Sequence, residues 1–163
     1  PHLFSSAASD VYKRQDYDRF FIPENYYTAC FTMASSEFRH AITNLSSIGE
    51  TIRLSCTKDN IEFIVEGFIG TAKLTYKNKH AQDNSIEFRD HPHKIRLRCD
   101  EPVKGNFTCK HLLVISKSGS LHDSVTISMS NDCPVCVQYR YGDAGYLRYY
   151  LAPLIDDESD DDT

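Results

Sequence analysis

The segment Gly145-Tyr-Leu-Arg-Tyr-Tyr-Leu-Ala-Pro-Leu-Ile155 sets the interpretation of the whole chain. Its residues alternate in character, which predicts a β-strand, because successive side chains of a strand point to opposite faces. Pro153 ends this strand, since proline has no N–H to give to a ladder. The segment indicates either a surface on which another chain docks or simply the last core strand of a β-rich domain. The two predicted faces hold Leu147, Tyr149 and Leu151 on one side and Tyr146, Arg148 and Tyr150 on the other.

Length and composition are those of an ordinary soluble globular domain. The chain has 163 residues, of which 40% are hydrophobic and 25% charged. One domain is therefore expected, with enough chain for a sizeable core. No run of about 18 apolar residues is present, so no membrane segment and no membrane partner is predicted. The net charge is −5, but six negative charges lie in residues 156–163, which leaves +1 for residues 1–155. That acidic end is predicted to be solvated and disordered.

The six cysteines could form three disulfides in a secreted protein. Most of them lie within apolar alternation, and no secretory leader is visible, so reduced thiols in an intracellular compartment are predicted instead. Cys133-Pro-Val-Cys136 has the spacing of a redox motif, although its surroundings are typical of a strand. A thiol redox enzyme stays open as a minor alternative. The only close histidine pair is His91-Pro-His93, so no metal and no cofactor is predicted.

The chain divides into four regions by composition. Residues 1–15 fit nothing that follows and are predicted to be a non-native or disordered lead-in. Residues 16–25 are predicted to be a connector, residues 26–155 the folded domain, and residues 156–163 the acidic tail. Within the folded domain, residues 77–93 are polar and weakly patterned, and are predicted to form a loop.

The folded domain contains the same pattern twice: a strand, a helix and three strands. Ser35 and Ser36 are expected to cap the first helix, whose apolar residues recur at helical spacing. Duplication with more strands than helices predicts an α+β fold in which two helices lie on one face of antiparallel sheet. The predicted strands are 26–33, 51–57, 61–66, 71–76, 95–99, 103–108, 125–130, 135–140 and 146–151, and the predicted helices are 36–46 and 110–117.

Both predicted helices carry basic residues on the face that is not apolar. Such a face is either an ordinary solvated surface or a surface that binds phosphates by charge and not by sequence. Few aromatic residues lie between the basic ones, which disfavours stacking with single-stranded bases. No paired acid and base, and no nucleophile with a base, is recognisable, so the sequence does not predict an enzyme. The basic residues are Arg39, His40, Lys110, His111 and Lys117.

A series of short motifs, in order along the chain, resembles the C-terminal half of the proliferating cell nuclear antigen family, the eukaryotic DNA sliding clamps. The last motif, followed by an acidic tail, is the most specific. The resemblance implies a DNA-clamp domain in a nuclear homotrimer that encircles duplex DNA, acts as a processivity factor and docks DNA polymerases and other replication and repair proteins. The motifs are Ser36-Glu-Phe, Ile48-Gly, Leu54-Ser-Cys-Thr-Lys-Asp59, Asp100-Glu-Pro-Val103, Val125-Thr-Ile-Ser-Met-Ser130 and Leu147-Arg-Tyr-Tyr-Leu-Ala-Pro153.

The resemblance also assigns roles to individual residues. It implies that Arg39, His40, Lys110 and Lys117 face DNA and that Lys58, on a turn, is the lysine to which ubiquitin is attached. The strand from Gly70 to Tyr76 is implied to pair with a neighbouring subunit. Aromatic and aliphatic anchors of partner peptides need an apolar pocket. The residues implied to form that pocket are Phe20, Ile22, Tyr27, Pro134, Tyr150, Ala152, Pro153 and Ile155.

Four features depart from the family pattern. The first domain and most of the connecting loop are missing from this sequence, so the chain alone is not expected to close a ring. Thr43 and Ser47 stand where many clamps carry basic residues, residues 77–93 are longer than usual, and Leu154 adds apolar surface. A checkpoint-type clamp subunit and a protein-interaction domain that does not bind DNA are the alternative functions.

Overall fold

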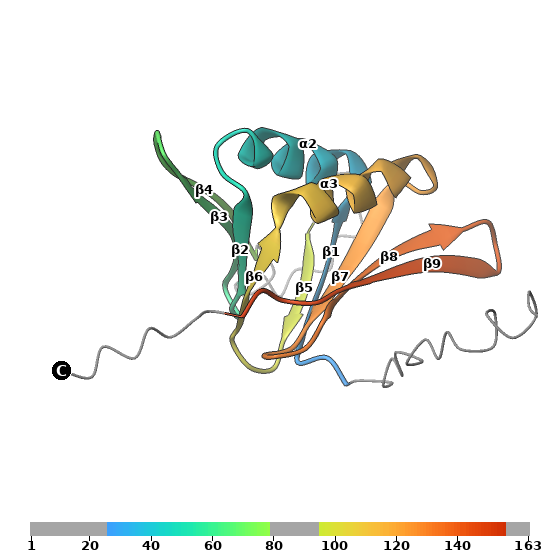
Figure 1. Ribbon diagram of the computed structural model, residues 1–163. Coiled ribbons are helices and arrows are strands. Elements are labelled where there is room, and N and C mark those ends of the chain that lie inside the picture. The colour runs from blue at the N-terminus through green and yellow to red at the C-terminus, as the bar shows by residue number, and fades with distance from the viewer. Residues whose placement is uncertain (1–25, 79–94, 156–163) are drawn as a thin grey trace, which may run out of the picture.

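The computed structural model describes residues 26–78 and 95–155. The predicted lead-in, the connector, most of the 77–93 loop and the acidic tail therefore lie outside the described residues. Two antiparallel sheets diverge from each other, and two helices cover the open side between them (Figure 1). In the described part of the chain, no helix is long and apolar enough to cross a membrane.

Five strands form the larger sheet, here called sheet A. Their order is β5 (Arg96–Cys99), β1 (Ala29–Ala34), β7 (Ser124–Met129), β8 (Val135–Tyr141) and β9 (Gly145–Leu151). All neighbours are antiparallel. The strand predicted around the aromatic C-terminal segment is therefore confirmed as β9, and it forms one edge of this sheet within the described residues.

Sheet B has four strands in the order β4 (Gly70–Lys77), β3 (Asn60–Gly67), β2 (Thr51–Cys56) and β6 (Val103–Thr108). The first three form the predicted meander, and β6 joins it from the second half of the chain. Strand β4 is an edge of the sheet as the structure describes it.

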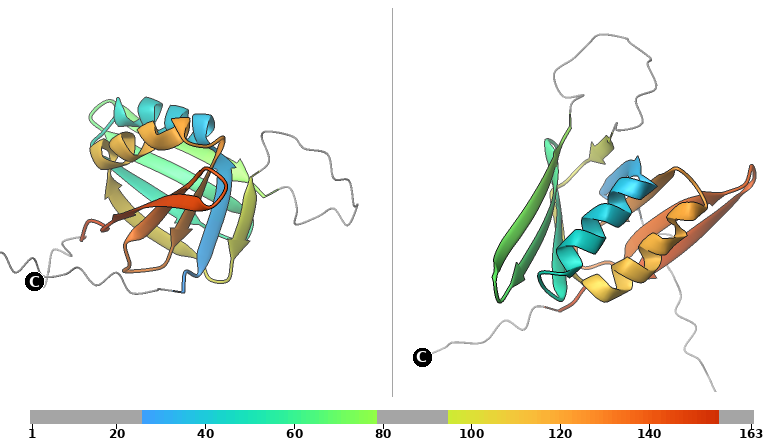
Figure 2. Two further views of the ribbon diagram at one scale, coloured as in Figure 1. Left: turned by 90° about the vertical axis from the view of Figure 1, so that its right-hand side faces the viewer. Right: turned by 90° about the horizontal axis from the view of Figure 1, so that it is seen from above.

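The two repeated units exchange their first strands. Strand β1 of the first unit pairs with β7 of the second, while β6 of the second unit pairs with β2 of the first. Consequently α2 (Ser35–Ser46) leads from sheet A to sheet B, and α3 (Cys109–Ser116) leads from sheet B to sheet A. A short 3-10 helix, η2 (Lys117–Ser120), continues α3. The helices lie side by side over both sheets (Figure 2).

The core lies between the helices and the inner faces of the two sheets. Phe63 of sheet B meets Phe31 of sheet A with ring centroids 6.3 Å apart, and meets Phe38 of α2 at 6.5 Å. Burying a side chain of this kind contributes about 1.5–3 kcal/mol. The predicted apolar stripe of the first helix is confirmed, because all its members are buried: Phe38, Ala41, Ile42 and Leu45.

Two local predictions were wrong. The first helix begins at Ser35 with Ala34 as its N-cap and has no capping side chain. The Ser35 hydroxyl instead donates to the His122 carbonyl, at 2.6 Å, because the loop before β7 lies against the helix start. The first strand begins at Ala29 and not at residue 26, because the chain bends at Thr28.

Candidate docking site and nucleic-acid surface

The predicted docking residues are centred on the outer face of sheet A, around Tyr150. Tyr150 lies directly opposite Cys136 of β8, and Cys136 lies opposite Ser128 of β7. Although it belongs to this outer face, Cys136 is only 5% exposed. Burial raises the pKa of the Cys136 thiol, even though neighbouring Arg148 and Tyr150 favour the thiolate. A side chain on an uncovered sheet face would be exposed to solvent. Neighbouring side chains therefore cover Cys136 and form a small apolar surface there.

Tyr27 lies near this surface. It precedes the bend at Thr28, is half-buried, and lies within electrostatic reach of Cys133, Cys136 and Tyr150. Burial, helped by these neighbours, raises the pKa of the Tyr27 phenol to about 12. Tyr27 and Tyr150 thus lie within electrostatic reach of each other, although they are 123 positions apart in the sequence.

Pro134 and Ala152 extend this surface toward the C-terminus. Val135 pairs with Leu151, so the next residues outward, Pro134 and Ala152, leave the sheet at the same place. The chain then crosses toward sheet B, where the Leu154 N–H donates to the Asn106 carbonyl of β6 at 2.8 Å. This bond fixes the direction of the last described residues.

The end of the chain exposes the remaining predicted docking residues unevenly. Ile155 is 90% exposed and Leu154 is 43% exposed, while Pro153 is half-buried. The extra apolar surface predicted at Leu154 is therefore present. Phe20 and Ile22 lie outside the described residues, so the described site consists of Tyr27, Pro134, Tyr150, Ala152, Pro153 and Ile155. Its phenol rings and aliphatic groups suit apolar anchors of a peptide, and its hydroxyls offer hydrogen bonds.

The helical layer carries the predicted basic surface. Arg39 and His40 on α2 are exposed, as are Lys110 on α3 and Lys117 at the start of η2. Within the described helices Glu37 is the one acidic residue, and after burial it is the neighbour that helps raise the pKa of Tyr76 of β4. Lys110 and Lys117 are seven positions apart, which places them about two turns apart on the same stripe. Exposed basic side chains with few acidic neighbours can bind the phosphates of a nucleic acid, and such contacts do not recognise the base sequence.

Lys58 lies in the turn between β2 and β3 and is exposed. The turn is held by its neighbours: the Thr57 hydroxyl bonds to the Asn60 side chain at 2.8 Å, and the Asn78 amide donates to the Lys58 carbonyl at 3.3 Å. Lys58 is therefore exposed on an ordered turn.

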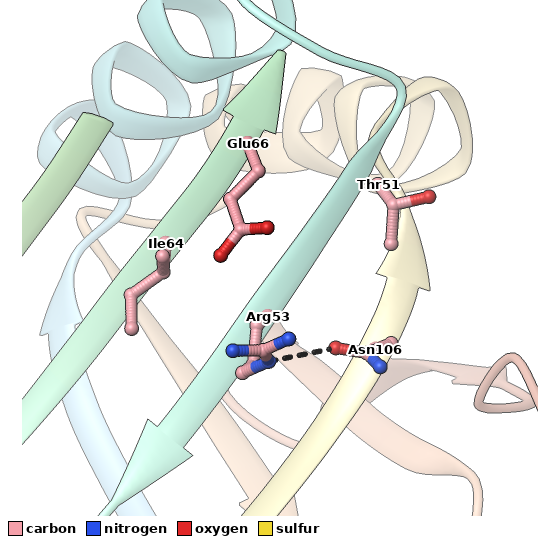
Figure 3. A pocket seen from close by; sticks show the side chains of 5 residues that line it. All are labelled: Thr51, Arg53, Ile64, Glu66 and Asn106. Carbon is pink, nitrogen blue, oxygen red and sulfur yellow. Dashed lines mark hydrogen bonds between the residues drawn. The ribbon is translucent and has the colours of Figure 1, made fainter. Parts of the chain in front are cut away.

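Sequence reasoning missed two features near these surfaces. One is a polar cluster of Tyr26, Arg98 and Asp100 beside the entrance to β1. The other is a shallow hollow on the outer face of sheet B, where Arg53 donates to Asn106 at 3.2 Å (Figure 3). Both bring together residues that are far apart in sequence, and alternation alone does not indicate such partners. The hollow is lined by Thr51, Arg53, Ile64, Glu66 and Asn106.

The six cysteines all lie within the described residues. All six cysteines are free. Among the described residues, no group of three or more histidine, cysteine, aspartate or glutamate side chains could hold a metal ion. His91 and His93 lie outside the described residues.

Comparison with known protein families agrees with the fold. Residues 21–154 match the family described as "Proliferating cell nuclear antigen, C-terminal domain". The matched range contains both helices, both sheets and most of the candidate docking site. Since the match covers most of the chain and the architecture is the duplicated α+β arrangement expected for it, this chain belongs to the sliding-clamp family of proliferating cell nuclear antigen.

Proposed function

We propose that this chain supplies the C-terminal half of a DNA polymerase processivity factor, a homotrimeric ring that encircles duplex DNA in the nucleus. The observation that carries the proposal is the joining of two surfaces on one clamp domain: exposed cations on the helical layer, and the apolar site around Tyr150 on the outer face of sheet A. In such a protein, retention on DNA is a consequence of topology, because a closed ring cannot leave the duplex sideways.

The DNA-facing role belongs to Arg39, His40, Lys110 and Lys117. Their exposure on neighbouring helices supports contact with the phosphate backbone, which needs charge and reach but no base recognition. No nucleophile or acid–base pair is assigned to this surface, so the proposed activity is mechanical tethering and not catalysis.

The docking role belongs to the site around Tyr150. Polymerases and other replication and repair proteins would bind here through short peptides with aromatic and aliphatic anchors. The burial of Cys136 and the half-buried Tyr27 phenol near Tyr150 support this role, because desolvated aromatic pockets hold the anchors that dominate binding energy. Phe20 and Ile22 are proposed to complete the site, and Lys58 is proposed as the lysine that accepts ubiquitin.

Assembly is proposed to use the edge of sheet B. Strand β4 is eight residues long, and the backbone N–H and C=O groups on its outer side have no strand partner in the described structure. An open edge of this length can pair with another chain. In the proposed ring, β4 pairs with a strand of a neighbour's first domain.

Size measurement tests this proposal. Light scattering coupled to chromatography would be applied to this chain alone and to its mixture with the first domain of a clamp of this family. We expect a ring of three pairs only in the mixture. A mixture that stays as separate components would contradict the proposal.

A checkpoint-type clamp subunit is the second candidate, because it would share the clamp domain that the family match supports. It would assemble with different subunits, so it would fail to form a ring of three identical pairs. A protein-interaction domain without DNA contact would retain the Tyr150 site but would tolerate charge reversal of Lys110 and Lys117.

A further inference from the structure

The segment Tyr26–Thr28, which leads into β1, occupies a position that strand geometry does not explain. In β1, Ala29 and Phe31 point into the core. Tyr27 has the same parity, and continued alternation would place it on the inner face as well. It lies instead within electrostatic reach of Cys136 and Tyr150, which belong to the outer face. The bend at Thr28 makes this possible, so the position of Tyr27 depends on what holds the bend.

The backbone of this segment makes few ladder hydrogen bonds. On one side, the Asp100 N–H donates to the Thr28 carbonyl at 2.8 Å. On the other, the Thr28 N–H donates to the Ser130 hydroxyl at 3.0 Å, and that hydroxyl donates to the Tyr26 carbonyl at 3.4 Å. A backbone N–H just after β5 and a side chain just after β7 therefore replace the strand pairing that stops at Ala29.

Arg98 and Asp100 make most of the side-chain contacts with this segment. Arg98 donates to the Tyr27 carbonyl at 2.9 Å and to the Tyr26 hydroxyl at 3.3 Å, and its guanidinium lies 5.4 Å from the centroid of the Tyr26 ring. The Tyr26 hydroxyl in turn donates to Asp100 at 2.9 Å, and Arg98 and Asp100 are 3.5 Å apart. Tyr26 is 74% exposed, so its ring adds little to the core and acts as the link between two charges.

We propose that Tyr26, Arg98 and Asp100 form a polar bracket that sets the direction of the chain entering β1 and holds Tyr27 near Cys136 and Tyr150. They are positioning residues for the docking site, acting through Tyr27. The last step of this inference rests on the proposed docking function, whereas the placement of Tyr27 does not.

The bracket differs from an ordinary surface ion pair because it contacts the Tyr26–Thr28 segment, which has few other hydrogen bonds. A single exposed ion pair contributes little to global stability. A short segment with few ladder bonds can open locally without global unfolding, and each contact then governs that local equilibrium. Loss of the bracket should therefore release Tyr27 and uncover Cys136 while the core stays folded.

Thiol alkylation tests the placement directly. The full chain would be treated with iodoacetamide, and the rate at each cysteine read by mass spectrometry of its peptides. Cys136 reports the position of Tyr27, and Cys109, which is 2% exposed at the start of α3, reports global opening. In Arg98→Gln and Tyr26→Phe, we expect Cys136 to react about three- to tenfold faster, in line with a local opening equilibrium, and Cys109 to be unchanged.

Matched variants sharpen the test. Arg96→Gln removes an exposed arginine from the same strand, where it lies opposite Thr32, and should leave the Cys136 rate unchanged. Asp100→Asn keeps an acceptor for the Tyr26 hydroxyl and should behave more like wild type than Asp100→Ala does. An unchanged Cys136 rate in both Arg98→Gln and Tyr26→Phe would overturn the inference. So would a rise at Cys136 that Cys109 matches.

Peptide binding separates this inference from the docking proposal. The chain, with a clamp first domain added, would be titrated with a synthetic clamp-binding peptide. We expect Arg98→Gln to weaken affinity about threefold or more, and Tyr150→Ala to weaken it further. A loss in Tyr150→Ala alone would keep the docking site and overturn the bracket's role in it. No loss in Tyr150→Ala would remove the docking site itself, while the alkylation rates still decide the placement of Tyr27.

Discussion

Two tyrosines of sheet A face the same interior and differ in what their hydroxyls meet. Tyr139 is fully buried, and its hydroxyl has no hydrogen-bond partner among the residues that the structure describes. Tyr149 is half-buried, and its hydroxyl shares a 2.6 Å hydrogen bond with Ser118 of η2. Burial also raises the pKa of Tyr139 well above its ordinary value. Tyr139 therefore shows a buried hydroxyl that costs stability because it has no hydrogen bond, and Tyr149 shows a hydroxyl whose hydrogen bond contributes to stability.

Replacing these tyrosines by phenylalanine should have opposite effects. Tyr139→Phe removes an unsatisfied polar atom and is expected to raise the free energy of unfolding by about 1 kcal/mol. Tyr149→Phe leaves Ser118 without its partner and is expected to lower that free energy by about 1 kcal/mol. Urea denaturation of both variants provides the measurement. A clear loss of stability in Tyr139→Phe would show that its hydroxyl has a partner.

Stability should fall at alkaline pH because of Cys56. Burial, with the Cys99 thiol nearby, raises the pKa of Cys56 to about 12. In the unfolded chain a cysteine titrates near its ordinary pKa of about 8.5, so above that pH the unfolded state binds fewer protons than the folded state. The free energy of unfolding therefore decreases as pH rises from about 8.5 toward 12. Tyr27 and Tyr76, whose pKa values are also raised to about 12, add to the decrease above about pH 10.

Urea unfolding at a series of pH values checks this dependence. Cys56→Ala should reduce the slope of unfolding free energy against pH between about 8.5 and 10, whatever its effect on stability at neutral pH. Cys133→Ala, in the turn before β8, is the matched control. Equal slopes in Cys56→Ala and wild type would contradict the assignment.

At the scale of elements, the close approach of α2's end to β3 restricts one position to glycine. A Cβ added to Gly67 would lie 1.8 Å from the Ile48 carbonyl oxygen, which belongs to backbone and cannot rotate away. Gly67→Ala must therefore separate the connection after α2 from β3. Gly119 is a milder case, because its Cβ would lie 3.3 Å from the Ser35 Cβ.

Gly67→Ala is expected to lower the free energy of unfolding by about 3 kcal/mol or more, at the upper end of the cost of overpacking. Gly119→Ala is expected to change it by less than about 1 kcal/mol. Thermal unfolding of the two variants side by side tests this difference. Equal melting temperatures would mean that the backbone relaxes at no cost.

Alternation predicted the strands and the helical spacing predicted the buried stripe of α2, because both report which side of one element is apolar. Neither pattern reports a partner, so the exchange of β1 and β6 between the units was not predicted. Ser35 was wrongly expected to cap α2 because its hydroxyl bonds to His122, which is 87 positions away. Tyr26 and Tyr27 were wrongly placed in a strand, because their contacts are with Arg98, Asp100 and Ser130 and not with a neighbouring strand's ladder.

At the scale of the whole molecule, one clamp domain cannot provide the retention of a ring. Non-specific binding to duplex DNA has a dissociation constant of roughly 10⁻⁴ to 10⁻⁶ M near physiological salt, and a few basic contacts belong at the weak end. Fluorescence anisotropy with a labelled duplex should show weak binding by this chain. Lys110→Glu with Lys117→Glu should weaken it further, and Lys104→Glu, on β6, should have a smaller effect. Nanomolar binding by the chain alone would contradict this account.

The exchanged first strands also mean that each half of the domain lacks a piece of its own sheet. Residues 26–78 hold β1 to β4, but β1 pairs in sheet A with strands of the second half. Residues 95–155 hold the remaining strands, but β6 pairs in sheet B with strands of the first half. Cutting the chain between 78 and 95 should therefore give two fragments that are each unfolded alone. Mixing the two fragments should restore the near-ultraviolet circular dichroism signal and cooperative unfolding. The domain would then behave as two complementary fragments that are covalently connected.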